Sequence, residues 1–245
     1  SALQSELLSN PESTYGEITS KGVRELEARL GIGEGDVFAD LGSGLGRCAL
    51  QVFLECSAAV VIALELDFAR HSAAVALAEA VLSRHGTARS QHRNGDALES
   101  KSWSSPQGRC LELHCCNVLQ GGRHWHKATA VYCSSLCFPD WVMEALSRQL
   151  DACPRLMWVA SLKMLPAYTT FSLESVERWP MSWNKGHERC PVYIYRRLPY
   201  YPLVRSLLEE PWHSFRKALQ EQEQLGRACP PPVSRSSSRG ALLIL

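Results

Sequence analysis

The sequence predicts an α/β protein built on a doubly wound, mostly parallel β-sheet with an antiparallel edge. Segments of strand character alternate with segments of helical period, which is the pattern of parallel sheets with crossover helices. Residues 58–66 form a continuous apolar run, as expected for a strand that is buried on both faces. Residues 40–46 form a glycine-rich turn from a strand to a helix, a position at which such sheets bind ligands.

The predicted elements follow one another along the chain. Apolar side chains at Val23, Leu26 and Leu30 have a helical period, and Gly31 is expected to end this helix over 21–30. The other predicted elements are strands over 36–39, 58–66, 109–115, 129–134 and 156–162, helices over 48–55, 68–85, 141–150 and 203–224, an irregular polar loop over 87–109, and two strand-like pieces within 174–196 that form an antiparallel edge.

The composition is that of an ordinary globular chain with a sizeable core: 245 residues, of which 45% are hydrophobic and 21% charged. The net charge of +1 gives no bulk electrostatic reason to expect nucleic-acid or membrane binding. No apolar run approaches the roughly 20 residues of a membrane span, and the first residues lack a signal-peptide pattern. Because the sequence starts at Ser1 rather than at a methionine, we expect a fragment or a processed piece.

The ten cysteines are scattered through apolar segments, which favours buried, reduced thiols in an intracellular protein over a disulfide framework. One cluster combines cysteine with histidine, but its spacing does not match the usual zinc motifs, and we expect no metal site there. This cluster consists of Cys110, His114, Cys115, Cys116, His124 and His126.

The glycine turn reads Asp40-Leu-Gly-Ser-Gly-Leu-Gly46, with glycines at every second position. A dinucleotide fingerprint would need its third glycine at position 47, which is Arg47. The spacing is instead similar to the first motif of class I methyltransferases, which bind S-adenosylmethionine. Asp40 can supply the carboxylate that the ammonium of this cofactor requires.

Acidic and amide side chains at the ends of the next strands are candidates for contacts with the nucleoside. Glu65 closes the second strand and is expected to accept hydrogen bonds from ribose hydroxyls, with Asp67 as the alternative. Asn117 follows the third strand, and its amide oxygen can accept a hydrogen bond from the adenine amino group while Val118 packs on the ring. Asp96 competes for this role, but no apolar strand precedes it.

The segment after the fourth strand lies where the methyl group would be transferred. Ser134, Ser135 and Phe138 are expected to line a narrow slot there. An alternative interpretation is purely structural, with a serine as a helix N-cap and the phenylalanine in the core.

Several motifs together resemble the disruptor-of-telomeric-silencing family of histone-lysine methyltransferases, which is the non-SET type. Tyr15 precedes Asp40 by 25 positions (40 − 15), and Glu65 follows Asp40 by 25 (65 − 40). The resemblance extends over roughly residues 14–197. Its motifs are Thr14-Tyr15-Gly16-Glu17-Ile18-Thr19, the glycine turn, Ser134–Phe138, Val159–Lys163, Ser182-Trp183 and Pro191–Tyr195.

The resemblance implies a role for each matching residue. Residues 15–18 would close over the cofactor, residues 38–47 would hold its methionine part, Glu65 would bind the ribose, and residues 117–118 the adenine. The lysine channel would be lined by Phe138, Trp183 and Tyr195, with Ser134 nearest the transferred methyl. The implied cofactor residues are Tyr15, Gly16, Glu17, Ile18, Phe38, Asp40, Gly42, Ser43, Gly44, Gly46, Arg47, Glu65, Asn117 and Val118.

The chain departs from the family pattern at several positions. Asn117 replaces an aspartate, Arg47 a glutamine, Ser134 an asparagine and Ile194 an aromatic residue. The family's N-terminal helical region and its lysine-rich nucleosome-binding extension have no counterpart in this sequence. The last two differences leave cofactor binding intact and bear on the binding of a nucleosomal substrate.

The sequence thus predicts four parts: an N-terminal segment 1–20 that contributes to the cofactor lid, a methyltransferase domain 21–205, a C-terminal helix 206–228 and a disordered tail 229–245. The expected function is S-adenosylmethionine-dependent methylation of a protein lysine, with a nucleosomal histone as the possible partner and a nuclear location. The alternatives are a methyltransferase that acts on a non-histone protein or small molecule, in the cytoplasm, and a non-catalytic binding module of the same fold.

Overall fold

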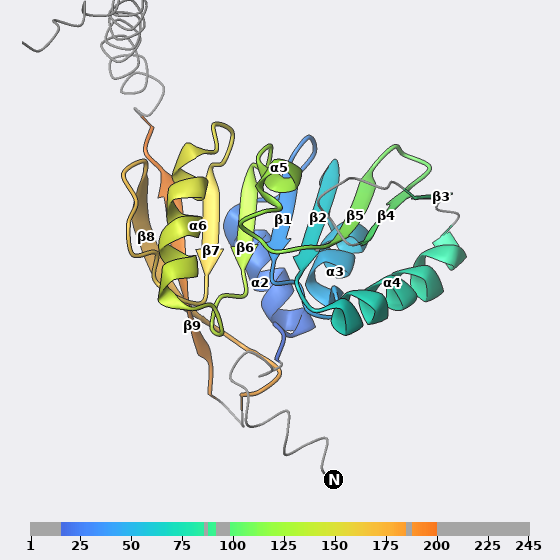
Figure 1. Cartoon of the computed structure of the whole chain (residues 1–245), viewed down its shortest axis with the longest axis horizontal. Coiled ribbons are helices and arrows are strands. Elements are labelled where there is room, and N and C mark those ends of the chain that lie inside the picture. The colour runs from blue at the N-terminus through green and yellow to red at the C-terminus, as the bar shows by residue number, and fades with distance from the viewer. Residues whose placement is uncertain (1–15, 86–87, 92–98, 185–187, 200–245) are drawn as a thin grey trace, which may run out of the picture. The chain divides into compact units, whose positions relative to one another are not determined.

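The computed structural model describes residues 16–85, 88–91, 99–184 and 188–199. Within these ranges the chain forms one nine-stranded sheet in the order β3-β4-β5-β2-β1-β6-β7-β9-β8 (Figure 1). All of them but Pro199 belong to a compact unit, Ser1–Leu198. The helix expected over 206–228 and the tail 229–245 lie outside the described residues.

The centre of the sheet is parallel. It consists of β5 (Cys110–Cys115), β2 (Val60–Glu65), β1 (Val37–Leu41), β6 (Ala130–Cys133) and β7 (Trp158–Ser161). The connecting helices are α3 (Arg47–Glu55), α4 (Phe68–Leu82), α5 (Gly122–Trp125) and α6 (Asp140–Ala152), and α2 (Ser20–Leu30) precedes β1. A short 3₁₀ turn (Ser83–His85) follows α4.

Both faces of the parallel strands are covered, which explains the continuous apolar run in β2. Val61 and Ala63 pack in a core with α2, α3 and α4, whereas Ile62 and Leu64 pack in a second core with α5 and α6. Burial on both faces removes the polar alternation that a half-exposed strand would need.

The antiparallel edge is confirmed. β8 (Phe171–Trp179) pairs with β9 (Cys190–Arg197), and β9 lies antiparallel between β7 and β8. A parallel sheet that ends in this inserted antiparallel strand is the arrangement of class I methyltransferases, so the predicted fold class is also confirmed.

The expected irregular loop over 87–109 is wrong. This region contains β3 (Ala88–Gln91) and β4 (Glu99–Ser104), and β4 pairs antiparallel with β5. Ser100, Lys101 and Ser102 made the segment look like a loop, yet all three are buried. The Lys101 ammonium lies 2.9 Å from a Glu99 carboxylate oxygen, which compensates its charge within the sheet.

None of the helices among the described residues is long and apolar enough to cross a membrane. The nine cysteines in this part of the chain are free.

Candidate active site

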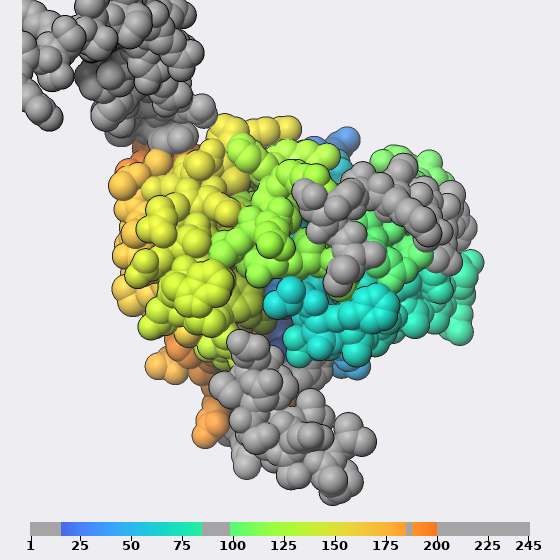
Figure 2. Space-filling view, in the orientation of Figure 1, coloured from blue at the N-terminus to red at the C-terminus, as the bar shows by residue number. Residues whose placement is uncertain are grey.

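A pocket of about 320 Å³ opens at the carboxyl ends of β1, β2 and β6, where the glycine turn lies. Figure 2 shows the surface hollowed between the segment after β2, in cyan, and the start of α6, in yellow-green. Strand ends at a switch in strand order are the usual ligand position in such sheets. The lining residues come from the segment before α2, the glycine turn, the end of β2, and the loops after β5 and β6.

The glycine turn has the geometry that its sequence predicts. Gly42, Gly44 and Gly46 all have positive φ (79°, 57° and 70°), which only glycine adopts without strain. The N–H groups of Gly42 and Ser43 both donate to the Leu64 carbonyl, so the turn is fixed to the end of β2. At Gly42 a Cβ would also lie 3.1 Å from the Phe138 ring, so this glycine brings the turn against the acceptor side of the pocket.

Asp40 lies at the floor of the pocket and is only 1% exposed. Neither carboxylate oxygen forms a hydrogen bond of normal geometry with a described residue. Burial, together with the nearby carboxylates of Glu17 and Glu65, raises the pKa of Asp40 to about 8, although the nearby Ala49 N–H and Cys48 thiol act to lower it. A buried carboxylate without an ion-pair partner is costly, and a cationic ligand would remove that cost.

Tyr132 stands beside Asp40 because the two residues are register partners in the β1–β6 pair. Tyr132 lines the pocket, and its buried hydroxyl forms no hydrogen bond of normal geometry with a described residue. Burial raises the pKa of Tyr132 well above its usual range, although the nearby Ser134 side chain acts to lower it, and the phenol therefore stays protonated. The Tyr132 hydroxyl, a donor, and the Asp40 carboxylate, an acceptor, thus lie at the same end of the pocket.

Residues 16–18 form one wall of the pocket and are fixed at both sides. Glu17 accepts the Leu45 N–H through Oε1 at 3.0 Å, and its backbone N–H donates to the Ser182 hydroxyl at 2.9 Å. Ile18 forms a β-bridge with Met181. Gly16 is required because a Cβ there would lie 2.1 Å from the Trp183 ring. The wall therefore links the glycine turn to the β8–β9 connection. Tyr15, which was also expected to contribute to this wall, lies outside the described residues.

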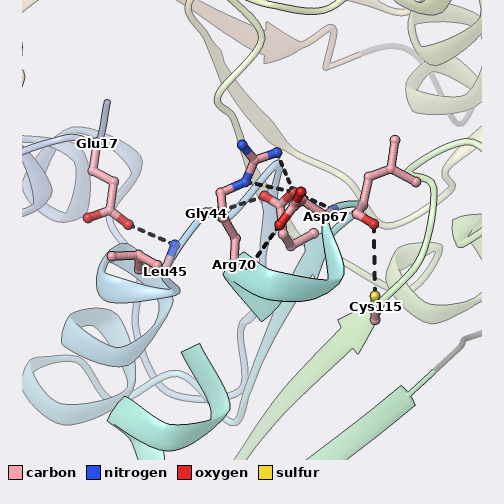
Figure 3. A network of polar contacts seen from close by, with 8 residues as sticks. Glu17, Gly44, Leu45, Asp67, Arg70 and Cys115 are labelled. Carbon is pink, nitrogen blue, oxygen red and sulfur yellow. Dashed lines mark hydrogen bonds and ion pairs between the residues drawn. The ribbon is translucent and has the colours of Figure 1, made fainter. Parts of the chain in front are cut away.

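Glu65 is 5% exposed and accepts hydrogen bonds from three residues (Figure 3). Its Oε2 accepts the Gly44 N–H at 2.8 Å. Its Oε1 accepts the Asp67 N–H at 2.8 Å, and the Arg70 guanidinium at 3.2 Å through Nε and at 3.0 Å through Nη2. The carboxylate expected to bind ribose is therefore already engaged, and Asp67 instead caps α4 through its side chain.

Asn117 and Val118 both line the pocket on the side of β5, as expected for an adenine subsite. The amide oxygen of Asn117 accepts the Leu119 N–H at 2.9 Å, so a hydrogen bond from adenine would be its second. Asp96, the alternative, lies outside the described residues.

The acceptor side is lined by Ser134, Phe138 and Trp183. Ser135 does not reach it, because its fully buried hydroxyl lies 3.0 Å from that of Ser161 and accepts the Lys163 N–H. The alternative of a serine N-cap is wrong, since Pro139 is the N-cap of α6.

Four of the expected site residues are not brought to the pocket. Tyr195 is fully buried in the core beside α6, and its hydroxyl accepts the Leu165 N–H at 2.9 Å. Phe38 is fully buried in the opposite core. Gly46 packs against Ala74, and Arg47 is largely exposed and pairs with Glu17. These residues support the turn or the sheet without facing a ligand.

The sequence interpretation missed several lining residues. Arg70 enters the pocket from the first turn of α4, and its only sequence signal is its place five positions after Glu65. Leu66, Leu136 and Trp141 line the pocket although they are 62%, 41% and 63% exposed. Large apolar residues directly after strand ends were the available signal for them.

The cysteine–histidine cluster does not converge on a ligand position. The His114 ring lies 2.9 Å from the Ser100 hydroxyl and 3.1 Å from a Glu112 carboxylate oxygen, and stacks on His124 at 4.0 Å. No three His, Cys, Asp or Glu side chains in the described part of the chain are arranged to hold a metal ion.

S-adenosylmethionine, the cofactor predicted from the sequence, fits this pocket. Its ammonium and sulfonium are cationic, and the pocket contains the carboxylates of Glu17, Asp40 and Glu65. Asp40 and Tyr132 offer an acceptor and a donor at one end of the pocket, and Asn117 and Val118 line it on the side of β5. The fold and this donor set both agree with that cofactor.

A protein-family model described as "Histone methylation protein DOT1" matches residues 5–105. The resemblance predicted from the motifs is confirmed over this range. It includes residues 15–18, the glycine turn and Glu65, which carry most of the expected cofactor contacts. No curated protein sequence matches the chain.

Solved structures similar to this chain include TrmN from Thermus thermophilus, with 16% identity and a TM-score of 0.49 over 72% of this chain and 48% of that one. An RNA methyltransferase from Salinibacter ruber in complex with S-adenosyl-L-homocysteine has 15% identity and a TM-score of 0.47 over 74% and 93%. A protein of the NADB-Rossmann superfamily from Streptococcus agalactiae has 12% identity and a TM-score of 0.48 over 73% and 68%. The fold assignment rests on the strand order rather than on these scores.

Proposed function

We propose that this protein is an S-adenosylmethionine-dependent methyltransferase whose acceptor is a lysine side chain of a protein. The observation that carries the proposal is the carboxylate of Asp40, which is buried next to an apolar opening and has no ion-pair partner among the described residues. Asp40 would hold the cofactor's ammonium, Glu65 its ribose, and Asn117 with Val118 its adenine. The transferable methyl would then face Ser134 and Phe138.

The mouth of the pocket supports a protein acceptor. Leu66, Leu136, Trp141 and Trp183 line the pocket and are all more than a third exposed. Lysine has a long aliphatic stem, which can pack along such a surface while its amine reaches inward. Nucleic-acid substrates instead require clustered lysine and arginine, and among the described residues that line the pocket Arg70 is the one basic side chain.

The chemistry is an in-line transfer that requires a neutral amine. The lysine ammonium first loses a proton to solvent, and an apolar slot favours this step because it lowers the lysine pKa. The amine lone pair then attacks the methyl carbon, the carbon–sulfur bond breaks, and its electron pair stays on sulfur. The methylammonium product carries the positive charge. Bound cofactor supplies the electrophilic methyl group.

The protein would contribute alignment and exclusion of water. Phe138 and Trp183 present aromatic faces, which favour methylammonium and sulfonium cations. Residues 16–18 cover the turn and are held by Leu45, Ser182 and Met181. Holding nucleophile and methyl group in a near-attack geometry accounts for a large part of such rate accelerations. No side chain is needed as a general base.

The protein acceptor is proposed to be either nucleosomal histone, which would place the protein in the nucleus, or another protein, which would allow a cytoplasmic location. The family match over residues 5–105 supports the histone. The near-neutral charge of the chain supports a substrate that is recognised without an extended basic surface.

Transfer of a radioactive methyl group from S-adenosylmethionine tests the proposal. Nucleosomes, free histones, total cellular protein and total RNA are incubated in parallel with the wild type, Phe138→Ala and Arg24→Ala. We expect label in methyl-lysine after acid hydrolysis of a protein fraction. Phe138→Ala should transfer much less label than the wild type. Arg24→Ala, which lies outside the pocket, should transfer as much label as the wild type. Label confined to RNA would overturn the protein acceptor, and absence of cofactor binding would overturn the whole proposal.

A further inference from the structure

Glu65, the proposed ribose-binding carboxylate, already accepts hydrogen bonds from residues of its own protein, among them Arg70. Glu65 accepts four hydrogen bonds: from the Gly44 N–H at Oε2, and from the Asp67 N–H and two nitrogens of Arg70 at Oε1. An ionised carboxylate has about four lone-pair positions. The described contacts place three donors on Oε1 and one on Oε2. Figure 3 draws them as dashed lines from Gly44, Asp67 and Arg70.

A ribose brings two neighbouring hydroxyl donors and needs one acceptor position on each carboxylate oxygen. Oε2 has a position left, but Oε1 already accepts three donors. Each carboxylate oxygen has about two lone-pair positions, so two-point capture of the ribose requires that two of the three donors leave Oε1.

Of the donors on Oε1, only Arg70 can leave without a change in the fold. The Asp67 N–H belongs to the turn between β2 and α4, and Asp67 also caps that helix. Arg70 is held by its side chain alone, which is 28% exposed and reaches into the pocket from the first turn of α4. An arginine side chain at a pocket edge can rotate into solvent.

We propose that Arg70 is a latch on the ribose subsite, which closes Glu65 in the free protein and swings out when a nucleoside binds. The inference rests on the proposed function, because it takes Glu65 as the ribose ligand. Arg70 is thus a positioning residue that sets cofactor affinity and, in the closed state, keeps the pocket's carboxylate paired.

The latch lowers the apparent affinity for the cofactor. A ligand that binds only the open state has its dissociation constant raised by the reciprocal of the open fraction. The Arg70 side chain is 28% exposed and that of Glu65 is 6% exposed. A partly exposed arginine–carboxylate pair with two hydrogen bonds corresponds to an open fraction of roughly a tenth to a third. Without the guanidinium, Glu65 keeps its two backbone donors and has two positions for the ribose hydroxyls.

Calorimetric titration of the full chain with S-adenosylmethionine and S-adenosylhomocysteine tests the latch. Arg70→Ala and Arg70→Gln are compared with the wild type, and thermal melting verifies that each variant is folded. We expect both variants to bind about 3- to 10-fold more tightly than the wild type. The matched control is Arg24→Ala, since Arg24 also contacts a carboxylate, Glu55, through Nε and Nη2 but outside the pocket. Its affinity should equal that of the wild type.

A pair of nucleosides separates the latch from a general change in pocket charge. Adenosine should gain affinity in Arg70→Ala, whereas 2′,3′-dideoxyadenosine, which has no ribose hydroxyls, should not. Equal gains for both nucleosides would overturn the latch in favour of a general charge effect. Unchanged or weaker cofactor binding in both Arg70 variants, with normal binding by the wild type, would overturn the latch alone. Absence of binding in every variant would overturn the proposed function as well.

Discussion

Near the carboxyl ends of β1 and β2, two buried carboxylates lie in the same pocket, but they differ in the hydrogen bonds that they accept. Asp40 is 1% exposed and forms no hydrogen bond of normal geometry with a described residue. Glu65 is 5% exposed and accepts four hydrogen bonds. The two carboxylates would therefore contribute differently to the free energy of ligand binding. Asp40 gains an interaction when a cation binds, whereas Glu65 exchanges existing hydrogen bonds for new ones.

The largest expected effect is on binding at Asp40. Asp40→Asn keeps the shape of the side chain but removes the charge that would pair with the cofactor's ammonium. Loss of one partner of a buried ion pair costs about 3–5 kcal/mol, so we expect the dissociation constant for S-adenosylmethionine to rise at least about 100-fold. Calorimetry measures it.

The control for this prediction is Asp140→Asn at the start of α6. Asp140 is next to the lining residues Pro139 and Trp141, and its side chain is 98% exposed. Its loss should change the dissociation constant by less than about twofold, because an exposed charge is screened by water. An equally weak effect of Asp40→Asn would remove Asp40 from the site.

The second effect is on folding at Glu65. Glu65→Ala leaves the N–H groups of Gly44 and Asp67 and the Arg70 guanidinium without their acceptor. We expect the free energy of unfolding, measured with urea in the absence of ligand, to fall by about 2–4 kcal/mol. Glu55→Ala removes the acceptor of an exposed arginine pair and should cost less than about 1 kcal/mol. Equal losses would mean that the Glu65 contacts are not stabilising.

The smallest expected effect is a gain in folding stability at high pH when Asp40 is replaced. The pKa of Asp40 is raised to about 8, chiefly by burial, whereas an unfolded aspartate titrates near about 3.9. The folded state therefore binds more protons between these values, and Asp40 lowers stability as pH rises from about 4 to about 8. Asp40→Asn, which cannot ionise, should be more stable than the wild type by about 1–3 kcal/mol at pH 9.

Urea unfolding at pH 5 and pH 9 measures this change. The stability difference between Asp40→Asn and the wild type should grow from pH 5 to pH 9. A stability difference that is constant with pH would show that folding does not raise the pKa of Asp40. Together with the binding prediction, this result would make Asp40 a residue that weakens the fold and strengthens ligand binding.

The cofactor side of the pocket could be predicted from the sequence because its signals are local. A turn that needs three positive φ values requires glycines at fixed positions. Asp40 is the next-to-last residue of β1, and Glu65 is the last residue of β2. Apolar period and continuity predicted the parallel strands and the helices α3, α4 and α6, whereas the short helix α5 was not predicted. The antiparallel edge followed from the strand-like pieces within 174–196.

Polar strands and side-chain facing could not be predicted in this way. β4 carries serines and a lysine that are buried only because β4 pairs with β5. Tyr195 alternates with Ile194 along β9, and which of them faces which core depends on the layers packed on either side of the sheet. The family resemblance placed Tyr195 in the channel, but the packing of α6 places it in the core.

The sequence by itself determined the fold class, the glycine turn and the two acidic residues near the strand ends, because these depend on backbone conformation and periodicity within short segments. Only the tertiary structure decided that Asp40 has no ion-pair partner among the described residues, that Arg70 closes Glu65, and that Ser134 rather than Ser135 faces the pocket. Those properties arise from contacts between segments far apart in the chain, where burial and the supply of hydrogen-bond donors are set by neighbours that local sequence does not specify.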